Sequence, residues 1–395
     1  MDAIDNEPLR EPPQPRPGRR LRRCASIEDV GSAARRSLPG PCFDWLDGGA
    51  GAEVTLRANR AAFERVSFRP RVLVDVAERE LATVACGTRL AFPAVLAPIG
   101  LAGIVRPGAE PAVARAAGRA GIAYCVSAGA STPIEEVARA ATGPLWFQLY
   151  LWRGSDVQER LLARAERCGC ETLVLTVDTP VGARRERDIR NDFRVPLSFT
   201  LRQHLANAVR YPGWSWRALR GPDVSFGNLE ETRGGALAQV MSRLHDASTT
   251  FDHVRRLRER WPGRLVVKGI LAPEDAVEAV ECGADAVVVS NHGGRQLDGA
   301  PATLDALAAV AAAVGVRGEV LVDGGVRRGA DIAKALALGA RAVLVGRPYL
   351  YGLAAGGEAG VDHVLDLLRR ELDVTLALLG RPSVADLDPS AVRVG

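Results

Sequence analysis

The chain has 395 residues, of which 47% are hydrophobic and 25% charged, as in a globular protein with a substantial core. Its formal net charge of +4 is small for this length and argues neither for nor against nucleic acid, and we expect no nucleic-acid partner. Neither a signal peptide nor an apolar run long enough to span a membrane occurs, so we expect a cytoplasmic protein.

Disulfide and metal chemistry are not indicated. The seven cysteines are odd in number, include no CxxC pair and mostly lie in apolar or helical surroundings, which indicates reduced, buried thiols. The five histidines show no ligand spacing, so we expect no metal site. Among the 51 basic residues the only lysines are Lys268 and Lys334, and all the others are arginine. A lysine that is retained despite this strong bias toward arginine is a candidate for a specific role.

The N-terminal part divides into an arm and a helical extension. Residues 1–25 are rich in proline and arginine, which predicts a disordered arm. Ser26 then caps a first helix, a second helix spans 38–47 and stops at glycines, and a third ends near Phe63. We expect one folded domain over 26–395.

From residue 90 onward, eight apolar runs alternate with eight helical segments. The strands are expected at 94–97, 122–127, 145–149, 172–177, 264–268, 285–290, 319–323 and 342–346. The helices are expected at 109–120, 134–141, 156–168, 250–260, 273–282, 303–314, 328–338 and 361–379. This alternation predicts an α/β protein with a parallel sheet and right-handed crossovers, and eight strand–helix units close a (β/α)₈ TIM barrel.

One long insertion, residues 187–249, separates the fourth strand from its helix. Insertions after a barrel strand lie at the catalytic mouth, so this one is a candidate lid or docking surface. Its residues 193–222 contain five arginines, five aromatic residues and no acid, a composition typical of a peripheral segment on anionic lipid. An ordinary lid or an oligomer contact is the alternative interpretation.

Polar or small residues follow every predicted strand, and on a closed barrel the strand ends share one pocket. At the seventh and eighth strands they are Gly324, Gly325, Arg327, Gly346 and Arg347, which suit the usual phosphate site of such barrels.

A second group comprises Tyr150, Asp178, Arg185, His292 and Arg295. Two arginines suit a carboxylate, a histidine can take a proton near neutral pH, and Asp178 can stabilise its charged form. Taken alone, His292 could equally be an ordinary loop histidine beside a surface arginine. Lys268 at a strand end can place its charge against an electron-rich part of a cofactor.

These residues belong to longer motifs that resemble those of the FMN-dependent L-2-hydroxy-acid oxidases and dehydrogenases, and most of all its mandelate and lactate dehydrogenases. The similarity runs from about residue 27 to the C-terminus. The motifs are Trp146-Phe-Gln-Leu-Tyr150, Leu175-Thr-Val-Asp178, Arg185-Glu-Arg-Asp188, Val267-Lys-Gly-Ile270, Ser290 to Asp298, and Asp323-Gly-Gly-Val-Arg-Arg328.

The resemblance implies roles for these positions. His292 would remove the proton of the substrate hydroxyl or Cα, Asp178 would stabilise its charged form, and Tyr150 would hydrogen-bond the hydroxyl oxygen. Arg185 and Arg295 would hold the substrate carboxylate. FMN would be bound by Pro98, Ile99, Gly100, Ser127, Gln148, Thr176, Lys268, Ser290, Asp323, Gly324, Gly325, Arg327, Gly346 and Arg347.

The chain departs from the family pattern in the substrate pocket. Trp45 stands where a carboxylate-binding tyrosine is usual, and its indole can donate one hydrogen bond with a different reach. Gly129 and Gly100 replace larger residues, which predicts extra volume for an aryl or bulky substituent. Ile99 replaces a frequent threonine beside the flavin and removes one possible hydrogen bond.

The resulting hypothesis is FMN-dependent oxidation of an (S)-2-hydroxy acid, either lactate or one with a bulky or aromatic side chain such as mandelate. The electron acceptor is quinone if residues 193–222 place the protein on the inner face of the membrane, and oxygen in an oxidase that produces hydrogen peroxide. A non-redox barrel that binds a phosphate ligand and a flavoprotein without turnover are the remaining alternatives. The resemblance also implies a homotetramer.

Overall fold

The computed structural model describes residues 18–152, 155–197, 199–222, 224–229 and 246–395. Eight parallel strands form a closed barrel in the order β10-β11-β4-β5-β6-β7-β8-β9, which confirms the predicted TIM barrel. The strands are β4 (Ala94–Leu96), β5 (Ala123–Ser127), β6 (Leu145–Tyr150), β7 (Thr172–Thr176), β8 (Arg264–Ile270), β9 (Ala286–Val289), β10 (Glu319–Val322) and β11 (Ala342–Val345). Their apolar residues are almost completely buried, as expected where helices cover the outside of a parallel barrel.

The surrounding helices agree with the predicted segments to within three residues at each end. They are α4 (Ala109–Arg119), α5 (Ile134–Ala140), α6 (Ser155–Arg167), α11 (Phe251–Arg260), α12 (Pro273–Glu281), α13 (Thr303–Val314), α14 (Gly329–Ala337) and α16 (Glu358–Leu379). One helix was missed, α15 (Arg347–Gly356), because its glycines are typical of a loop. Gly352 serves packing instead: a Cβ there would lie 2.3 Å from the carbonyl oxygen of Gly360 on α16.

The N-terminal extension consists of α1 (Ile27–Ser37), α2 (Gly40–Asp47) and α3 (Val54–Arg65). Ser26 caps α1 as predicted, in a reciprocal box with Asp29. Short strands complete the fold and were not predicted: β1 (Val66–Phe68) pairs with β12 (Val392–Val394), and β2 (Thr83–Ala85) pairs with β3 (Thr88–Leu90).

The expected disordered arm is wrong over its last residues. Residues 1–17 lie outside the described part of the chain, but Leu21–Arg23 forms a 3₁₀ turn, and Leu21 and Cys24 are buried. His363 of α16 hydrogen-bonds the Cys24 carbonyl, so these residues belong to the fold. Two apolar side chains within an arginine-rich run were too weak a signal to predict this.

The two lysines occupy different environments. Lys334 of α14 donates to the Phe63 carbonyl at 2.8 Å and lies over the Phe68 ring, so it ties the extension to the barrel. Lys268 ends near the barrel axis and is almost completely buried. Only Lys268 therefore belongs to the candidate site.

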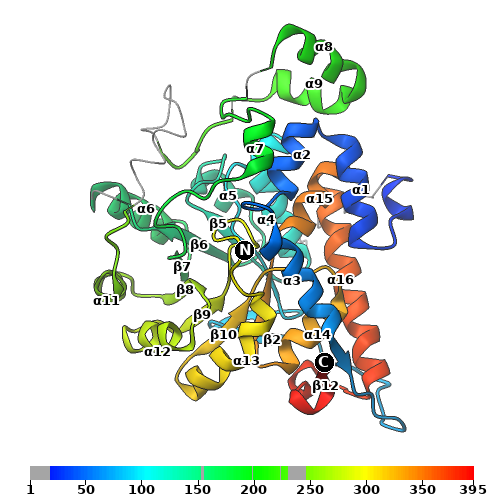
Figure 1. Ribbon diagram of the computed structural model, residues 1–395, viewed down its shortest axis with the longest axis vertical. Helices are drawn as coiled ribbons and strands as arrows, with labels where there is room; N and C mark the ends of the chain where they lie inside the picture. Colours follow the sequence, from blue (N-terminus) through cyan, green and yellow to red (C-terminus); the bar gives the residue numbers. More distant parts are fainter. Residues whose placement is uncertain (1–17, 153–154, 198, 223, 230–245) are drawn as a thin grey trace, which may run out of the picture.

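The insertion after β7 contains α7 (Glu186–Arg190), α8 (Leu201–Arg210) and α9 (Pro212–Arg220). α8 and α9 form a hairpin that stands off the barrel at the top of Figure 1. Within the described residues, no helix is both long and apolar enough to cross a bilayer.

Candidate active site

A cavity of about 420 Å³ lies at the carboxyl ends of the barrel strands, a size usual for small-molecule sites. Most of the predicted site residues line it: Trp45, Pro98, Ile99, Gly100, Ser127, Gly129, Tyr150, Arg185, Lys268, His292, Arg295, Asp323, Gly324, Gly325, Arg327, Gly346 and Arg347. The other four, Gln148, Thr176, Asp178 and Ser290, stand behind it, hydrogen-bonded to lining residues directly or through one another. The residues that were predicted from the strand ends therefore lie together, in or directly behind one cavity.

The loop after β9 presents His292 to the cavity. His292 has a φ of 59°, in the left-handed region that side chains other than glycine rarely adopt, and Gly293 and Gly294 follow with φ of 63° and 74°. The loop is held by a buried amide pair, in which Asn291 and Asn59 of α3 donate to each other at 2.8 and 2.9 Å. This anchoring offsets the backbone strain and fixes the imidazole.

A hydrogen bond of 3.0 Å joins His292 Nδ1 to Asp178 Oδ1. Burial opposes ionisation of Asp178, but His292 and Lys268 outweigh it and hold the pKa of this carboxyl below its usual value. Gly269 leaves room for the carboxylate, since a Cβ there would lie 2.7 Å from the Asp178 Cβ. With Nδ1 engaged, Nε2 is the imidazole nitrogen that can exchange a proton with a ligand.

Three half-buried arginines, Arg185, Arg295 and Arg347, line the cavity. Burial lowers the pKa of each one, and the pKa of Arg295 is lowered further by Arg185 and Arg347. Arg295 Nη1 donates to the carbonyls of Trp45 and Gly48 at 2.9 and 2.8 Å. Desolvated positive charge of this kind favours an anionic ligand.

A second side of the site, the strand wall, is a network of residues at the ends of barrel strands: Ser127, Gln148, Thr176, Lys268 and Asp323. Ser127 Oγ donates to Gln148 Oε1 at 2.9 Å, and Gln148 Nε2 donates to Thr176 Oγ1 at 3.0 Å, which links β5, β6 and β7. Lys268 Nζ lies 3.1 Å from Asp323 Oδ2 and donates to Ser290 Oγ at 3.0 Å. Burial lowers the pKa of Lys268, but Asp323 and Asp178 overcome it and raise the pKa overall, so this ammonium stays charged.

Tyr150 ends β6 at the edge between the two walls. Its ring stacks on Trp152, with ring centroids 6.1 Å apart. Burial, followed by the charge of Asp178, raises the pKa of its hydroxyl, so the hydroxyl remains protonated near neutral pH. Tyr150 therefore carries a protonated hydroxyl among the residues that line the cavity.

Comparison with known proteins assigns this arrangement to a family. The FMN-dependent dehydrogenase family matches residues 34–394. The chain belongs to this family. It is 42% identical over 371 residues to the (S)-mandelate dehydrogenase of Pseudomonas putida, covering 93% of each chain. It is 44% identical over 365 residues to the L-lactate oxidase of Nostoc sp., covering 91% of this chain and 96% of that one. A crystal structure of the monotopic membrane protein (S)-mandelate dehydrogenase matches with a TM-score of 0.90 at 41% identity, covering 94% of this chain and 99% of that one.

The FMN-dependent dehydrogenase family implies FMN as cofactor, and the residues present fit it. Two buried polar atoms of cavity-lining residues have no hydrogen-bond partner within the described residues: Arg185 Nε and Asp323 Oδ1. Buried polar atoms are normally paired, so these two are groups that bound ligands would satisfy. Donors and acceptors on the strand wall match the polar edge of a flavin ring, and Arg327 provides a cation for its phosphate.

Arg347 lines the cavity and is also bound to the surrounding loops. Its Nε, Nη1 and Nη2 donate to the backbone carbonyls of Asp47, Gly293 and Gly48 at 3.0, 2.9 and 2.8 Å. In the described part of the chain, the Arg327 guanidinium donates only to the Val326 carbonyl. Arg327 therefore has more N–H groups left for a phosphate than Arg347, which also holds the loops together.

Two glycines that were predicted to bind phosphate are also required by packing. Gly324 and Gly325 have φ of 89° and 90°. A Cβ on Gly325 would lie 2.3 Å from the Asn59 carbonyl oxygen, and a Cβ on Gly324 would lie 2.9 Å from Thr303 Oγ1. The Asp-Gly-Gly motif thus lets α3 approach the barrel rim, whatever ligand its N–H groups bind.

Gly100 and Gly129 were predicted to leave empty volume for the substrate, but other atoms of the protein occupy much of the space beside both glycines. A Cβ on Gly100 would lie 2.9 Å from the Gly129 carbonyl oxygen, so this glycine permits close backbone contact. A Cβ on Gly129 would lie 3.1 Å from a ring carbon of Phe226. Phe226, from the insertion, fills part of the space that Gly129 leaves.

Phe226 is the one aromatic residue among several described cavity-lining residues that sequence reasoning missed. Its position is fixed by Gly227 N, which donates to the Ala130 carbonyl, and by Asn228, which donates to the carbonyls of Ser127 and Ala128. Nothing periodic marks it, because it lies in an irregular segment far from its β5 neighbours in sequence. The clue was a lone aromatic residue followed by Gly227 and Asn228, within the insertion.

Trp45 lines the cavity as predicted. Its ring stacks on Phe193 of the insertion, with ring centroids 6.1 Å apart, and the Arg295 guanidinium lies 5.9 Å from the Trp45 ring centroid. The indole therefore restrains the arginine through its face. Ile99 lines the cavity near Gly346, with its Cδ1 3.6 Å from where a Gly346 Cβ would stand.

Proposed function

We propose that this protein oxidises an (S)-2-hydroxy acid with an aromatic or bulky side chain, such as mandelate, to the 2-oxo acid, with lactate as the smaller candidate. FMN-dependent oxidation of a 2-hydroxy acid follows from the family. The observation that carries the finer proposal is the His292–Asp178 pair beside two half-buried arginines, Arg185 and Arg295, that line the cavity. A base and a carboxylate site on one wall suit a molecule that carries a hydroxyl next to a carboxylate.

In this proposal Arg185 and Arg295 bind the substrate carboxylate and orient the neighbouring carbon. His292 takes the proton from the hydroxyl or from Cα, and Asp178 stabilises the imidazolium that forms. Tyr150 donates a hydrogen bond to the hydroxyl oxygen. Bound FMN supplies the two-electron acceptor for the substrate carbon.

The strand wall is the proposed FMN side. Gln148, Thr176, Ser127 and Ser290 would present polar groups to the ring, with Lys268 adding a fixed positive charge. The backbone of Pro98 to Gly100 would lie against the ring. Asp323, Gly324, Gly325, Arg327, Gly346 and Arg347 would bind the ribityl phosphate end.

The preference for an aromatic substituent rests on the ring of Phe226. It forms an apolar wall beside Gly129, where an aryl group can pack edge-to-face or offset-stacked. A methyl group, as in lactate, would bury less surface there and gain less.

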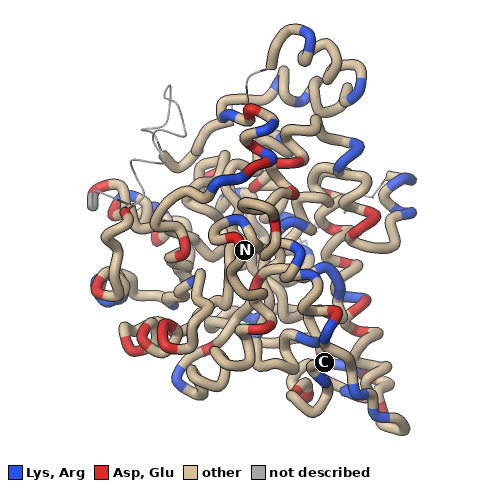
Figure 2. Tube along the Cα trace, in the orientation of Figure 1, with Lys and Arg blue, Asp and Glu red and all other residues tan. Residues whose placement is uncertain are grey.

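We further propose that the α8–α9 hairpin makes a peripheral contact with anionic lipid on the inner face of the cell membrane. Leu201, Leu205 and Val209 lie four residues apart on α8 and are 77%, 63% and 84% exposed. Figure 2 shows basic positions and no acidic ones on this hairpin, and Arg220 lies 3.9 Å from the Trp216 ring centroid. Exposed apolar and basic side chains on one protrusion suit a lipid interface, and a matching structure is of a monotopic membrane protein.

Membrane contact would favour quinone as electron acceptor. The 44% identity to an L-lactate oxidase supports oxygen as the second candidate. Rapid hydrogen peroxide formation by purified protein in air would favour the oxidase, and reduction of a soluble quinone without peroxide would favour the dehydrogenase. The homotetramer remains a prediction that light scattering can test.

The decisive experiment is anaerobic bleaching of the bound flavin by a panel of (S)-2-hydroxy acids. We expect (S)-mandelate to bleach it with a larger kcat/KM than (S)-lactate, and (R)-mandelate to leave it yellow. Bleaching by no acid of the panel would refute the proposal. Membrane contact is tested by sedimentation with phosphatidylglycerol vesicles, which Leu205→Glu should abolish while leaving kcat on a soluble quinone unchanged.

A further inference from the structure

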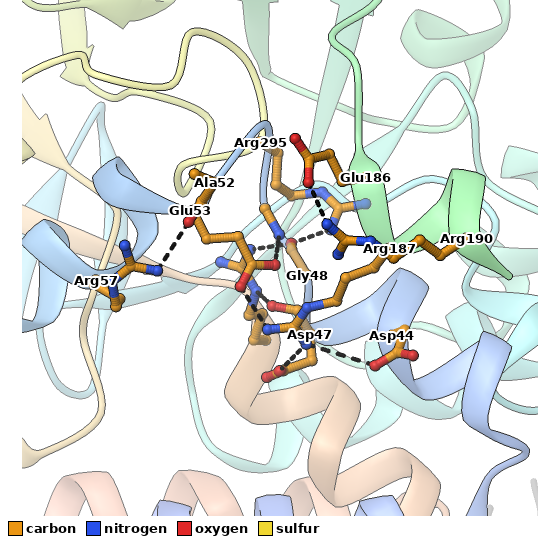
Figure 3. Close-up of polar contacts among 12 residues, drawn as sticks. Asp44, Asp47, Gly48, Ala52, Glu53, Arg57, Glu186, Arg187, Arg190 and Arg295 are labelled. Atoms are coloured by element: carbon orange, nitrogen blue, oxygen red, sulfur yellow. Dashed lines mark hydrogen bonds and ion pairs between the residues drawn. The ribbon is translucent and has the colours of Figure 1, made fainter.

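Arg187 stands at the centre of an ionic cluster outside the cavity. It lies on α7, the first helix of the insertion, and faces three carboxylates of the N-terminal extension (Figure 3). Its Nη1 is 3.0 Å from Asp47 Oδ2 and 3.6 Å from Asp44 Oδ1, and its Nη2 is 2.6 Å from Glu53 Oε2. One guanidinium thus joins the end of α2 to the start of α3.

The segment between these helices begins with the Gly48–Gly49 turn, and one of the three carboxylates, that of Glu53, holds it directly. Glu53 Oε1 accepts from Gly49 N at 2.9 Å, while its other oxygen pairs with Arg187. Glu53 has a φ of 62°, so a strained backbone position is used to aim this carboxylate at the turn. The Asp47 carboxylate also accepts from the Tyr351 hydroxyl at 2.6 Å.

The Gly48 carbonyl in this turn is shared by two half-buried arginines of the cavity. Arg295 Nη1 and Arg347 Nη2 each donate to it at 2.8 Å. It lies at the carboxyl end of α2, where the helix dipole is negative. This oxygen is therefore the anchor that the two guanidinium groups share, although they repel each other. Among the described residues, neither group forms an ion pair with a carboxylate.

From this geometry we propose that Arg187 is a positioning residue for the cavity. It neutralises Asp44, Asp47 and Glu53, keeps the Gly48 carbonyl in place, and so fixes Arg295 for the substrate carboxylate and Arg347 for the cofactor end. The proposal rests on the proposed function for the role of Arg295. Without Arg187 three carboxylates would repel one another across the Gly48–Gly49 turn, and the turn would shift.

The structure supplies a matched control on the same helix. Arg190 of α7 pairs with Glu186, and both side chains are exposed. Arg187→Met and Arg190→Met remove the same charge and keep a similar stem, but only the first breaks the link to the turn (Figure 3). Glu53→Gln is a milder variant, because the amide oxygen can still accept from Gly49 N.

The experiment measures two dissociation constants on each variant. One is for the 2-oxo acid product, phenylglyoxylate, read from the change in flavin absorbance of the holoenzyme. The other is for FMN, read from fluorescence quenching on adding it to apoprotein. We expect both to rise about tenfold in Arg187→Met, in line with the cost of a small misplacement of binding groups. Arg190→Met should match wild type, and Arg187→Lys and Glu53→Gln should fall between.

A purely structural role predicts a different result. It would lower Tm and the yield of active protein, with unchanged constants in the molecules that fold. The positioning role predicts a KM that rises about tenfold while kcat at saturating acid stays within about twofold, because among the described residues no hydrogen bond joins the side chain of His292 or Asp178 to the turn. Wild-type constants for both ligands in Arg187→Met, or in Glu53→Gln if that protein does not fold, would overturn the proposal. If wild type itself binds no 2-oxo acid, the proposed function fails, and the FMN constant alone still decides the role of Arg187.

Discussion

The two walls of the cavity are built in different ways. The strand wall (Ser127, Gln148, Thr176, Lys268 and Asp323) comes from five barrel strands or their immediate ends, and its groups hydrogen-bond one another. The loop wall (Trp45, Arg185, Phe226, His292 and Arg295) comes from the extension, the insertion and the loop after β9, and its groups are held mainly by backbone carbonyls and by other loops.

This difference separates two tasks. Charge on the strand wall is balanced, since Lys268 faces Asp323, so the wall is set before any ligand binds. On the loop wall burial lowers the pKa of Arg185 and Arg295, which shows that positive charge is held there at a free-energy cost. An anionic substrate would relieve that cost, so specificity for the acid belongs to the loop wall.

The largest test of this division is His292→Ala. It removes the proposed base from the loop wall and leaves the strand wall intact. We expect the rate of flavin bleaching by (S)-mandelate to fall by about 10²- to 10⁴-fold, the usual size of a general-base contribution. FMN content after purification should equal that of wild type. Stopped-flow absorbance measures both, and full bleaching at the wild-type rate would remove His292 as the base.

Arg295→Lys probes the carboxylate site itself. A lysine keeps the charge but cannot donate to the Trp45 and Gly48 carbonyls and also present a planar fork to a carboxylate. We expect KM for the acid to rise about 10- to 100-fold, with a smaller fall in kcat. Lys334→Arg, the reverse exchange at a structural position, is the control and should change neither constant. An unchanged KM in Arg295→Lys would place the carboxylate elsewhere.

The same division explains how much could be predicted from the sequence. The eight strands follow from apolar runs, and residues at strand ends must converge once the barrel closes, so the strand wall was predictable residue by residue. Phe226 reaches the cavity through an irregular segment whose path no periodicity encodes. The free volume beside Gly129 was overestimated for that reason. A glycine in the sequence shows that its own side chain is missing, but it does not show which distant residue fills the space.

Asp178→Asn tests the pair that bridges the two walls, through the pH dependence of stability. The folded-state pKa of Asp178 lies below its usual value, so the carboxylate stabilises the fold above about pH 4, and this contribution is lost as pH falls through the folded pKa. At pH 7 we expect Asp178→Asn to lower the free energy of unfolding by about 1.5–3 kcal/mol. The difference from wild type should shrink below pH 4.

Asp188→Asn is the matched control for Asp178→Asn. Burial raises the pKa of Asp188, so its ionised form gains nothing from folding, and this variant should cost less at pH 7 than Asp178→Asn. Urea unfolding of holoprotein at several pH values measures both. A difference between Asp178→Asn and wild type that stays constant down to pH 3 would contradict the assigned pKa direction.

The smallest expected effect concerns Phe226. Phe226 is an uncharged residue of the loop wall, so it tests whether this wall selects the substrate by shape as well as by charge. Phe226→Ala should lower kcat/KM for (S)-mandelate by about 10-fold and leave that for (S)-lactate nearly unchanged, since a methyl substituent reaches less of the ring. Gly129→Ala should also lower kcat/KM for mandelate, because its new methyl would lie 3.1 Å from the Phe226 ring and displace it. In the double variant Phe226→Ala/Gly129→Ala, the Gly129→Ala substitution should cause no further loss, because the Phe226 ring with which its methyl group clashes is absent. Additive losses in that cycle would show that the two positions act independently and that Phe226 does not shape the substituent pocket.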